Sequence, residues 1–251
     1  MIRAFIFDLD GTLVETELLK AQAYAAVSQT LLGLDAPDER AIDVYRRIVG
    51  ATDETAARTM VDELGLASAI YEGAEQPWQA LSRLQVERYR SDFASGDGLR
   101  SVVYHHAIDL LRDQAASKMA IAVATSSQTE DADRVTEEIG ISHLLDVLVG
   151  RDQVINGKPD PEIYLKTAEL LHVSPDEVIV VEDSATGLES AVRAGMRCIA
   201  IASAFSGDGL RGQTLLHQEC CVYQVENLTS VVQRLLAEAE QSSDGLMGPL
   251  R

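Results

Sequence analysis

The sequence predicts an α/β fold: a doubly wound parallel sheet that carries an all-helical insertion after its first strand. Short apolar runs rich in β-branched residues alternate with segments of helical periodicity along most of the chain. Residues 15–93 instead contain helical patterns only. The chain has 251 residues, enough to bury the core of one large domain or two modest ones without disulfides.

The expected strands are near-continuous apolar runs, which are typical of strands covered by helices on both faces. They lie at 3–8, 119–125, 144–149, 178–182 and 197–202, with a weaker run near 221. Helical patterns occur between or after them at 160–171, 189–194 and 228–239. This alternation favours a Rossmann-like arrangement in which the strands run parallel.

The insertion is predicted from the length of one connection. More than a hundred residues separate the first strand from the second, too many for a single crossover helix. Within this stretch, helices are expected at 17–31, 38–49, 54–64 and 78–89. We predict a core domain of residues 1–14 and 95–240, a helical cap of residues 15–94 and a flexible tail of residues 241–251. The link at 94–98 has the flexible composition ASGDG, so we expect the cap to act as a lid.

Charge and composition exclude several functional classes. The formal net charge of −19 repels nucleic-acid backbones and anionic membranes, and no stripe of Lys and Arg offsets it. No apolar run is long enough for a signal peptide or a transmembrane helix. The three cysteines, Cys198, Cys220 and Cys221, lack metal-binding or redox spacing. We therefore expect a cytoplasmic protein, by default a monomer, that binds neither nucleic acid nor membranes.

Polar residues follow the predicted strands, at the edge where open α/β sheets bind ligands. The segments are Asp8-Leu9-Asp10-Gly11-Thr12 after the first strand, Thr125-Ser126-Ser127 after the second and Glu182-Asp183-Ser184 after the strand at 178–182. Lys158 lies in Asn156-Gly157-Lys158-Pro159-Asp160, just before a predicted helix. Any one of these segments is more typical of a turn, a helix cap or a solvated surface. Several acids and a lysine at one edge indicate that a cation and an anionic group fill the space between them.

The residue types at this edge indicate chemistry on phosphate. Carboxylate oxygens suit Mg²⁺, which usually bridges protein carboxylates to a substrate phosphate. The ion, Lys158, the Thr125 hydroxyl and backbone N–H groups of the turn at Gly11 would hold that phosphate. One aspartate of the Asp8/Asp10 pair can attack phosphorus to form an aspartyl-phosphate, while the other moves protons.

These segments resemble the four motifs of the haloacid dehalogenase (HAD) superfamily, and the insertion resembles the type 1 cap of its phosphatase and phosphomutase branch. The resemblance covers residues from about 3 to 240. It implies that Asp8 is the nucleophile and that Asp10 is the general acid/base, whose backbone carbonyl also helps to hold Mg²⁺. It places the second motif on Thr125, beside Ser126, and the motif lysine on Lys158.

The resemblance also implies the metal ligands. Asp8 and Asp10 of the first motif would be joined by the acids of the VVEDSATG segment, Glu182 and Asp183, of which Asp183 is preferred as a direct ligand. The second acid of the first motif distinguishes the reactions of the superfamily. Dehalogenases of this fold lack it and phosphonoacetaldehyde hydrolases resemble DxAGT, so phosphate transfer to water or to a sugar hydroxyl remains.

The cap sequence favours water as the acceptor. In β-phosphoglucomutases the stretch after the first motif resembles DTAxxH and the cap carries an arginine shortly after a glycine, whereas this chain has Lys20 and Asp53 at those places. We therefore expect a Mg²⁺-dependent phosphatase acting on a small phosphorylated metabolite such as a sugar phosphate, with a β-phosphoglucomutase-like mutase as the alternative. Lys20 either binds a phosphate or carboxylate of the substrate or is a helix-surface lysine.

A histidine metal site, a phospho-receiver module and an inactive scaffold are less well supported by the sequence. His105 and His106 stand where relatives resemble YPGA, but no acid or third histidine lies at ligand spacing, so the pair is a poor metal site. A phospho-receiver module also combines clustered acids, a Ser or Thr and a Lys, but receivers are much shorter and have no cap. An inactive scaffold is disfavoured because every matched catalytic position retains a competent side chain.

Overall fold

The computed structural model divides the chain into two compact units. The sheet unit contains Met1–Val14 and Tyr104–Arg251, and the helical unit contains Glu15–Val103. The structure describes residues 1–48, 51–70, 76–93, 96–201, 221–223, 228 and 231–237. The tail predicted at 241–251 lies outside these residues.

The sheet unit is built on a six-stranded parallel sheet with the strand order β3-β2-β1-β4-β5-β6. Its strands are β1 (Ala4–Phe7), β2 (Ala120–Ala124), β3 (Val147–Val149), β4 (Val178–Glu182), β5 (Arg197–Ala200) and β6 (Cys221–Tyr223). The strand order reverses beside β1, and open sheets of this kind bind ligands at the carboxyl ends of the strands next to such a reversal. The predicted parallel α/β fold is confirmed, and its expected ligand edge lies after β1 and β4.

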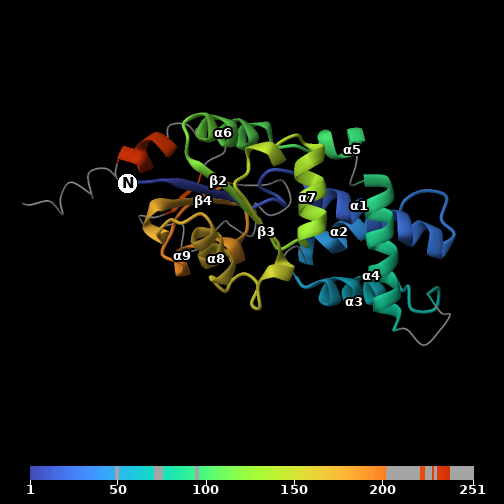
Figure 1. Cartoon of the computed structure of the whole chain (residues 1–251). Coiled ribbons are helices and arrows are strands. Elements are labelled where there is room, and N and C mark those ends of the chain that lie inside the picture. Colours follow the sequence, from blue (N-terminus) through green and yellow to red (C-terminus); the bar gives the residue numbers. More distant parts are fainter. Residues whose placement is uncertain are drawn as a thin grey trace, which may run out of the picture. The chain divides into compact units, whose positions relative to one another are not determined.

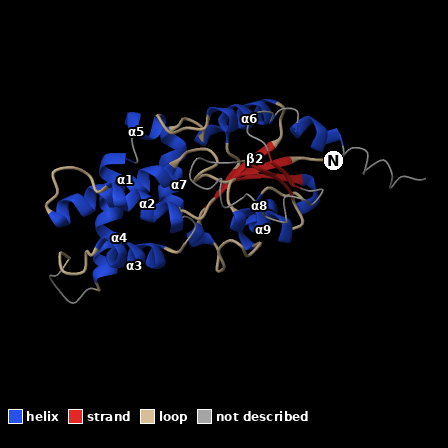
Figure 2. Cartoon of the chain, turned by 180° about the vertical axis from the view of Figure 1, so that it is seen from behind, coloured by secondary structure: helices blue, strands red, loops and turns tan. Residues whose placement is uncertain are grey.

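Helices cover both faces of the sheet (Figures 1 and 2). They are α6 (His105–Ala116), α7 (Thr129–Glu138), α8 (Glu162–Leu170) and α9 (Ala185–Arg193), with 3-10 turns at Ser142–Leu144, Arg151–Gln153 and Pro175–Glu177. On one face Ile6 and Val180 pack against Tyr164 of α8 and Leu188 of α9, and all four side chains are fully buried. Near-continuous apolar runs form these strands because both of their faces are buried.

In the described part of the helical unit every named element is a helix, in agreement with the pattern of residues 15–93. They are α1 (Thr16–Leu32), α2 (Glu39–Ile48), α3 (Asp53–Leu64), α4 (Pro77–Arg88), a π-helical turn at Tyr89–Phe93 and α5 (Gly96–Arg100). Gly33 and Gly65 end α1 and α3 with left-handed backbones, φ 65° and 70°, which glycine adopts without steric cost. Met60 and Leu81 are fully buried where α3 packs on α4.

The return link differs from its expected form. Residues 96–98, which the composition assigned to a flexible link, belong to α5, while residues 94 and 95 lie outside the described part of the chain. Leu99 anchors this short helix because its side chain is fully buried, and α5 packs against Tyr89–Phe93. The boundary between the units accordingly falls between Val103 and Tyr104, compared with 94/95 in the sequence-based division.

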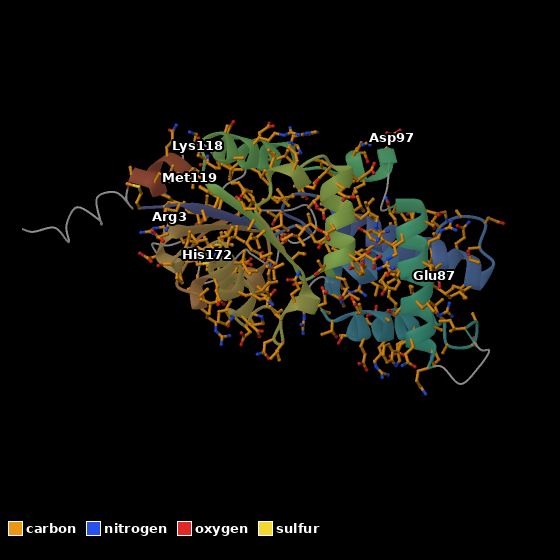
Figure 3. All side chains as sticks on the ribbon, viewed as in Figure 1. Arg3, Glu87, Asp97, Lys118, Met119 and His172 are labelled. Carbon is orange, nitrogen blue, oxygen red and sulfur yellow. The ribbon has the colours of Figure 1, made fainter. Side chains whose placement is uncertain are left out.

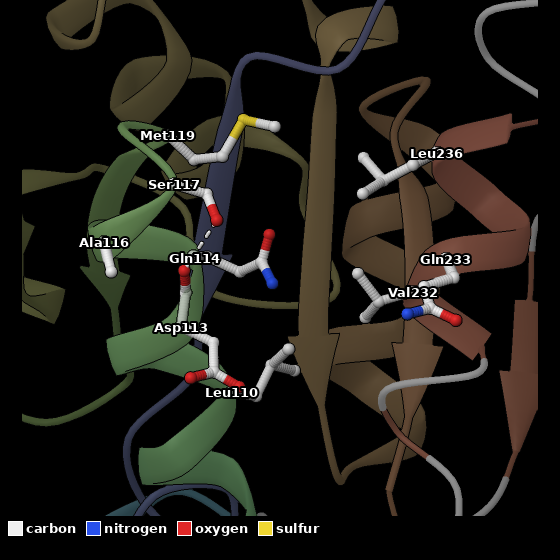
Figure 4. Close-up of a pocket in the computed structure, with 9 residues that line it drawn as sticks. All are labelled: Leu110, Asp113, Gln114, Ala116, Ser117, Met119, Val232, Gln233 and Leu236. Atoms are coloured by element: carbon white, nitrogen blue, oxygen red, sulfur yellow. Dashed lines mark hydrogen bonds between the residues drawn. The ribbon is translucent and has the colours of Figure 1, made fainter.

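A groove lies at the opposite edge of the sheet unit, where the strands begin. Arg3 and Met119 directly precede β1 and β2 and lie together at this end (Figure 3). The groove, of about 520 Å³, opens nearby, between the end of α6 and the helical residues 231–237 (Figure 4). Its lining is mixed: apolar side chains, among them Leu110, Met119 and Val232, alternate with polar ones. The polar ones are Asp113, Gln114, Ser117 and Gln233. Among the described residues, no helix is long and apolar enough to cross a membrane.

Candidate active site

The register of the sheet brings Asp8 and Glu182 side by side. Ile6 of β1 pairs with Val180 of β4, and the Asp8 amide donates to the Val181 carbonyl at 2.9 Å. Side chains alternate between the faces of a sheet, so residues two positions further point to the same face as Ile6 and Val180. Asp8 and Glu182 therefore leave the ends of their strands toward the face that α8 covers.

Lys158 joins these two acids. Its Nζ donates to Asp8 Oδ1 at 2.6 Å, to Glu182 Oε1 at 2.7 Å and to the Ala124 carbonyl at 3.1 Å. The three ammonium hydrogens are thus all used, and the lysine side chain is only 3% exposed. A buried lysine that donates to two strand-end acids forms a cationic centre at the expected ligand edge of the sheet.

The pKa values of Asp8 and Lys158 are both raised, for different reasons. Burial, together with Glu182, Asp183 and Asp10, raises the pKa of Asp8 well above its ordinary value, and Lys158 opposes that rise. Burial also acts to lower the pKa of Lys158, but the Asp8 and Glu182 carboxylates outweigh it and hold that pKa well above its ordinary value. The lysine is therefore a permanent positive charge, which the excess of acids around it requires.

Glu182 uses both of its carboxylate oxygens in hydrogen bonds. Oε1 accepts from Lys158 and from the Tyr164 hydroxyl at 3.1 Å. Oε2 accepts from the amides of Asp183 and Ser184 at 2.8 and 2.7 Å and from the Ser184 hydroxyl at 3.0 Å, at the start of α9. The structure thus gives Glu182 the task of holding Lys158, and its assignment as a direct metal ligand stays a prediction.

Two glycines clear the space that the adjacent acids occupy. A Cβ on Gly187, in the first turn of α9, would lie 1.7 Å from Glu182 Oε1. A Cβ on Gly11 would lie 2.1 Å from Asp183 Oδ2, and Gly11 also has a φ of +87° that few other residues adopt. Each acid therefore lies against a backbone that only glycine leaves open.

The first-motif turn and the end of β2 position Asp10. Asp10 Oδ2 accepts from the Thr125 hydroxyl at 3.0 Å and from the Ser127 hydroxyl at 2.6 Å. The structure therefore brings Thr125 to Asp10 together with Ser127, whereas Ser126 is exposed. Ser127 was part of the quoted strand-end segment, but spacing alone does not indicate which of its hydroxyls reaches the acid.

Asp183 lies against the turn that follows β1. Its Oδ1 is 3.4 Å from the Thr12 hydroxyl, a long hydrogen bond, and its carboxylate rests against Gly11. Both Asp8 and Asp183 are buried, with 5% and 3% of their surfaces exposed. Asp8 and Asp183 are thus both buried carboxylates, and Asp183 lies against the turn at Gly11.

Lys20 lies in the helical unit, on α1. Its Nζ donates to Glu17 Oε1 at 2.7 Å, and Glu17 Oε2 accepts from the Tyr45 hydroxyl, also at 2.7 Å. Burial, with the Glu17 carboxylate, raises the pKa of Tyr45 well above its ordinary value. Lys20 is therefore a member of a largely buried polar cluster, and its role in substrate binding stays a prediction.

The paired histidines begin α6. His105 is exposed, and the half-buried His106 packs edge-on against Tyr104 with ring centroids 5.6 Å apart. Burial lowers the pKa of His106. Over the described ranges, no three His, Cys, Asp or Glu side chains are grouped as a metal cage. Mg²⁺ does not need such a cage, because one or two carboxylates with substrate oxygens and water suffice.

Comparison with known proteins identifies the family of the chain. The family model of haloacid dehalogenase-like hydrolases matches residues 5–201. The phosphorylated carbohydrates phosphatase of Thermotoga maritima is 31% identical over 198 residues, which cover 79% of this chain and 84% of that protein. The N-acetylmuramic acid 6-phosphate phosphatase of Pseudomonas putida is 30% identical over 204 residues, 80% of this chain and 82% of that protein.

A solved structure of a β-phosphoglucomutase from Clostridium difficile has the same fold, with a TM-score of 0.68 and 21% identity over 95% of this chain and 98% of that one. The family match extends from β1 to just beyond β5 and includes every sheet-unit residue that the sequence predicted for the site. The chain belongs to the haloacid dehalogenase-like hydrolase family.

Proposed function

We propose that the protein is a Mg²⁺-dependent phosphatase that hydrolyses a small phosphorylated metabolite, with sugar phosphates as the substrate class, through an aspartyl-phosphate on Asp8. The observation that carries this is the buried contact of Lys158 with Asp8, 2.6 Å long, at the ligand edge of the sheet. A nucleophilic carboxylate beside a permanent cation suits an anionic substrate in a protein of net charge −19. The two phosphatases named above support the substrate class.

The residues present fit a magnesium ion. Asp8 and Asp183 offer buried carboxylates, and the proposed third ligand is the backbone carbonyl of Asp10, whose side chain is turned to Thr125 and Ser127. These are hard oxygen donors, and their small number leaves room for phosphate oxygens and water. When bound, Mg²⁺ would neutralise charge on the phosphoryl oxygens during transfer.

Asp8 and Asp10 then carry out different steps of the proposed reaction. An oxygen of the Asp8 carboxylate attacks phosphorus, and the bond from phosphorus to the leaving oxygen breaks. Asp10 gives a proton to that leaving oxygen and later takes one from the water that hydrolyses the aspartyl-phosphate. Thr125 and Ser127 hold Asp10 in place, and Lys158 donates to the phosphoryl oxygens.

The first test is a substrate panel. The purified protein with Mg²⁺ is expected to release inorganic phosphate from sugar phosphates and from 4-nitrophenyl phosphate, and chelation by EDTA should abolish the release until Mg²⁺ is restored. Colorimetric phosphate determination measures both. A broad panel that gives no phosphate above an Asp8→Asn control would refute the proposal.

The same panel separates hydrolysis from phosphate transfer between sugar hydroxyls. A mutase would convert β-glucose 1-phosphate to glucose 6-phosphate in the presence of a bisphosphate primer, with little phosphate release. The ion pair of Lys20 with Glu17 and the acid at Asp53 argue against this outcome. Formation of glucose 6-phosphate faster than phosphate release would replace the phosphatase assignment by the mutase alternative.

Gly187→Ala is expected to lower kcat/KM by about two orders of magnitude, the cost of a misplacement of roughly 1 Å in a catalytic site. The backbone of Gly187 is helical and tolerates alanine, but the new Cβ would overlap the Glu182 carboxylate, which must then move away from Lys158. Steady-state kinetics with 4-nitrophenyl phosphate measures the effect. Gly98→Ala in α5, where the new Cβ would meet its nearest atom at 3.6 Å, is the matched control and should leave the rate unchanged.

A further inference from the structure

Tyr164 has a buried hydroxyl group that has no part in the proposed reaction steps. It lies on α8 with none of its surface exposed, within the apolar cluster under the sheet. A phenylalanine would fill the same volume without the cost of burying a hydroxyl group. The hydroxyl is nevertheless satisfied, because it donates to Glu182 Oε1 at 3.1 Å.

Tyr164 contacts the catalytic lysine in two ways. Its hydroxyl shares Glu182 Oε1 with Lys158, whose Nζ lies 2.7 Å from the same oxygen. Its ring is also near the ammonium, with Nζ 5.0 Å from the ring centroid, within the range of a cation–π interaction. Lys158 is therefore bordered by two carboxylates, one carbonyl and one aromatic ring.

This arrangement matters when a phosphate group arrives. The three hydrogens of Lys158 are already donated to Asp8, Glu182 and the Ala124 carbonyl, so the lysine must give up part of one bond to reach a phosphoryl oxygen. The Tyr164 hydroxyl weakens the hold of Glu182 Oε1 on Lys158, since that oxygen is already hydrogen-bonded to a second donor. The ring of the same residue lies 5.0 Å from Nζ and so also borders the ammonium.

We propose that Tyr164 is a positioning residue that makes Lys158 available to the substrate phosphate, acting through the shared oxygen of Glu182. The inference rests on the proposed function, in which Lys158 binds phosphate. It predicts that loss of the hydroxyl alone strengthens the Glu182–Lys158 contact and weakens phosphate binding, while the fold, its core packing and the ring contact remain.

Tyr164→Phe tests this inference. With saturating Mg²⁺, calorimetry should show a Kd for inorganic phosphate about tenfold higher than that of the wild-type protein, the size expected for a changed hydrogen bond to a charged group. KM for 4-nitrophenyl phosphate should rise by a similar factor, with kcat changing less. Thr167→Val is the matched control, because it removes another fully buried hydroxyl of α8, one that donates only to the Ile163 carbonyl at 2.7 Å.

The outcomes separate the inference from the proposed function. Unchanged phosphate affinity in Tyr164→Phe, or an equal loss in Thr167→Val, would overturn the inference even if the wild-type enzyme is an active phosphatase. A loss of affinity that accompanies a large fall in unfolding temperature would also overturn it. If the wild-type protein binds phosphate but hydrolyses no ester, the proposed function fails, and the ratio of the two Kd values still decides the role of Tyr164.

Discussion

Asp8→Asn is expected to reduce kcat/KM by about four to six orders of magnitude, because the amide cannot attack phosphorus and no other side chain described here replaces the nucleophile. The variant should fold normally. Burial already raises the pKa of Asp8, so the site accepts a neutral group of this shape, and the Asn oxygen can still accept from Lys158. Phosphate release from 4-nitrophenyl phosphate and urea unfolding measure the two effects.

Asp152→Asn provides the matched control for loss of an acid at the same edge. Asp152 follows β3 and accepts from the amide and hydroxyl of Thr129, both at 2.7 Å, at the start of α7. An asparagine can make the same cap, so activity should remain near the wild-type value. Residual activity of Asp8→Asn above about one per cent would contradict the assignment of Asp8 as the nucleophile.

Lys158→Met is expected to have the largest effect on stability. It leaves Asp8 and Glu182 buried without their shared cation, and breaking a buried ion pair from one side costs about 3–5 kcal/mol of unfolding free energy. Catalysis should also fall by about two to three orders of magnitude through lost neutralisation of the phosphoryl group. The unfolding measurement is made with a chelator, so that no metal ion compensates the acids.

The loss of stability in Lys158→Met should depend on pH. Because the folded-state pKa of Asp8 lies above its ordinary value, the folded protein binds more protons than the unfolded chain between those two values, and unfolding free energy falls as pH rises through this window. Removing Lys158 removes the interaction that lowers this pKa, so the dependence becomes steeper. The variant should recover stability relative to wild type as the pH is lowered through this window.

Lys166→Met is the control for this variant. Lys166 lies on α8 and donates to the Gln153 carbonyl, so its removal leaves no buried acid without a partner. It should change unfolding free energy little and leave its pH dependence unchanged. If Lys158→Met is as stable as wild type at pH 8 in chelator, Asp8 and Glu182 are not buried around Lys158 in the way that the structure shows.

Much of the fold followed from local patterns. The runs at 178–182 and 197–202 correspond to β4 and β5, since burial on both faces requires nearly every residue of such a strand to be apolar. The run at 144–149 was longer than β3, because Ser142–Leu144 forms a 3-10 turn that an apolar composition does not reveal. Residues 96–98 of the predicted link belong to α5, and composition does not indicate that the neighbouring Leu99 is buried.

The contacts around the acids were harder to predict. Tyr164 occupies an apolar helix position and is typical of a core residue, so its hydroxyl gave no signal. Gly187 is one of several glycines in the chain, and only the position of the Glu182 carboxylate shows why a side chain is excluded there. Ser127 and Ser126 are equivalent by type and spacing, and the path of the loop after β2 selects the first of them for Asp10.

By itself, the sequence predicted which acids lie at the ligand edge, because the ends of apolar strands are set by local composition. Lys158 lies in the segment before α8, and the fold brings it to these acids. The tertiary structure decided what each acid contacts. Glu182 and Asp183 are neighbours of the same chemical kind, yet consecutive side chains at a strand end point to opposite sides. Glu182 therefore follows Val180 to the face of α8 and holds Lys158, while Asp183 turns to Gly11.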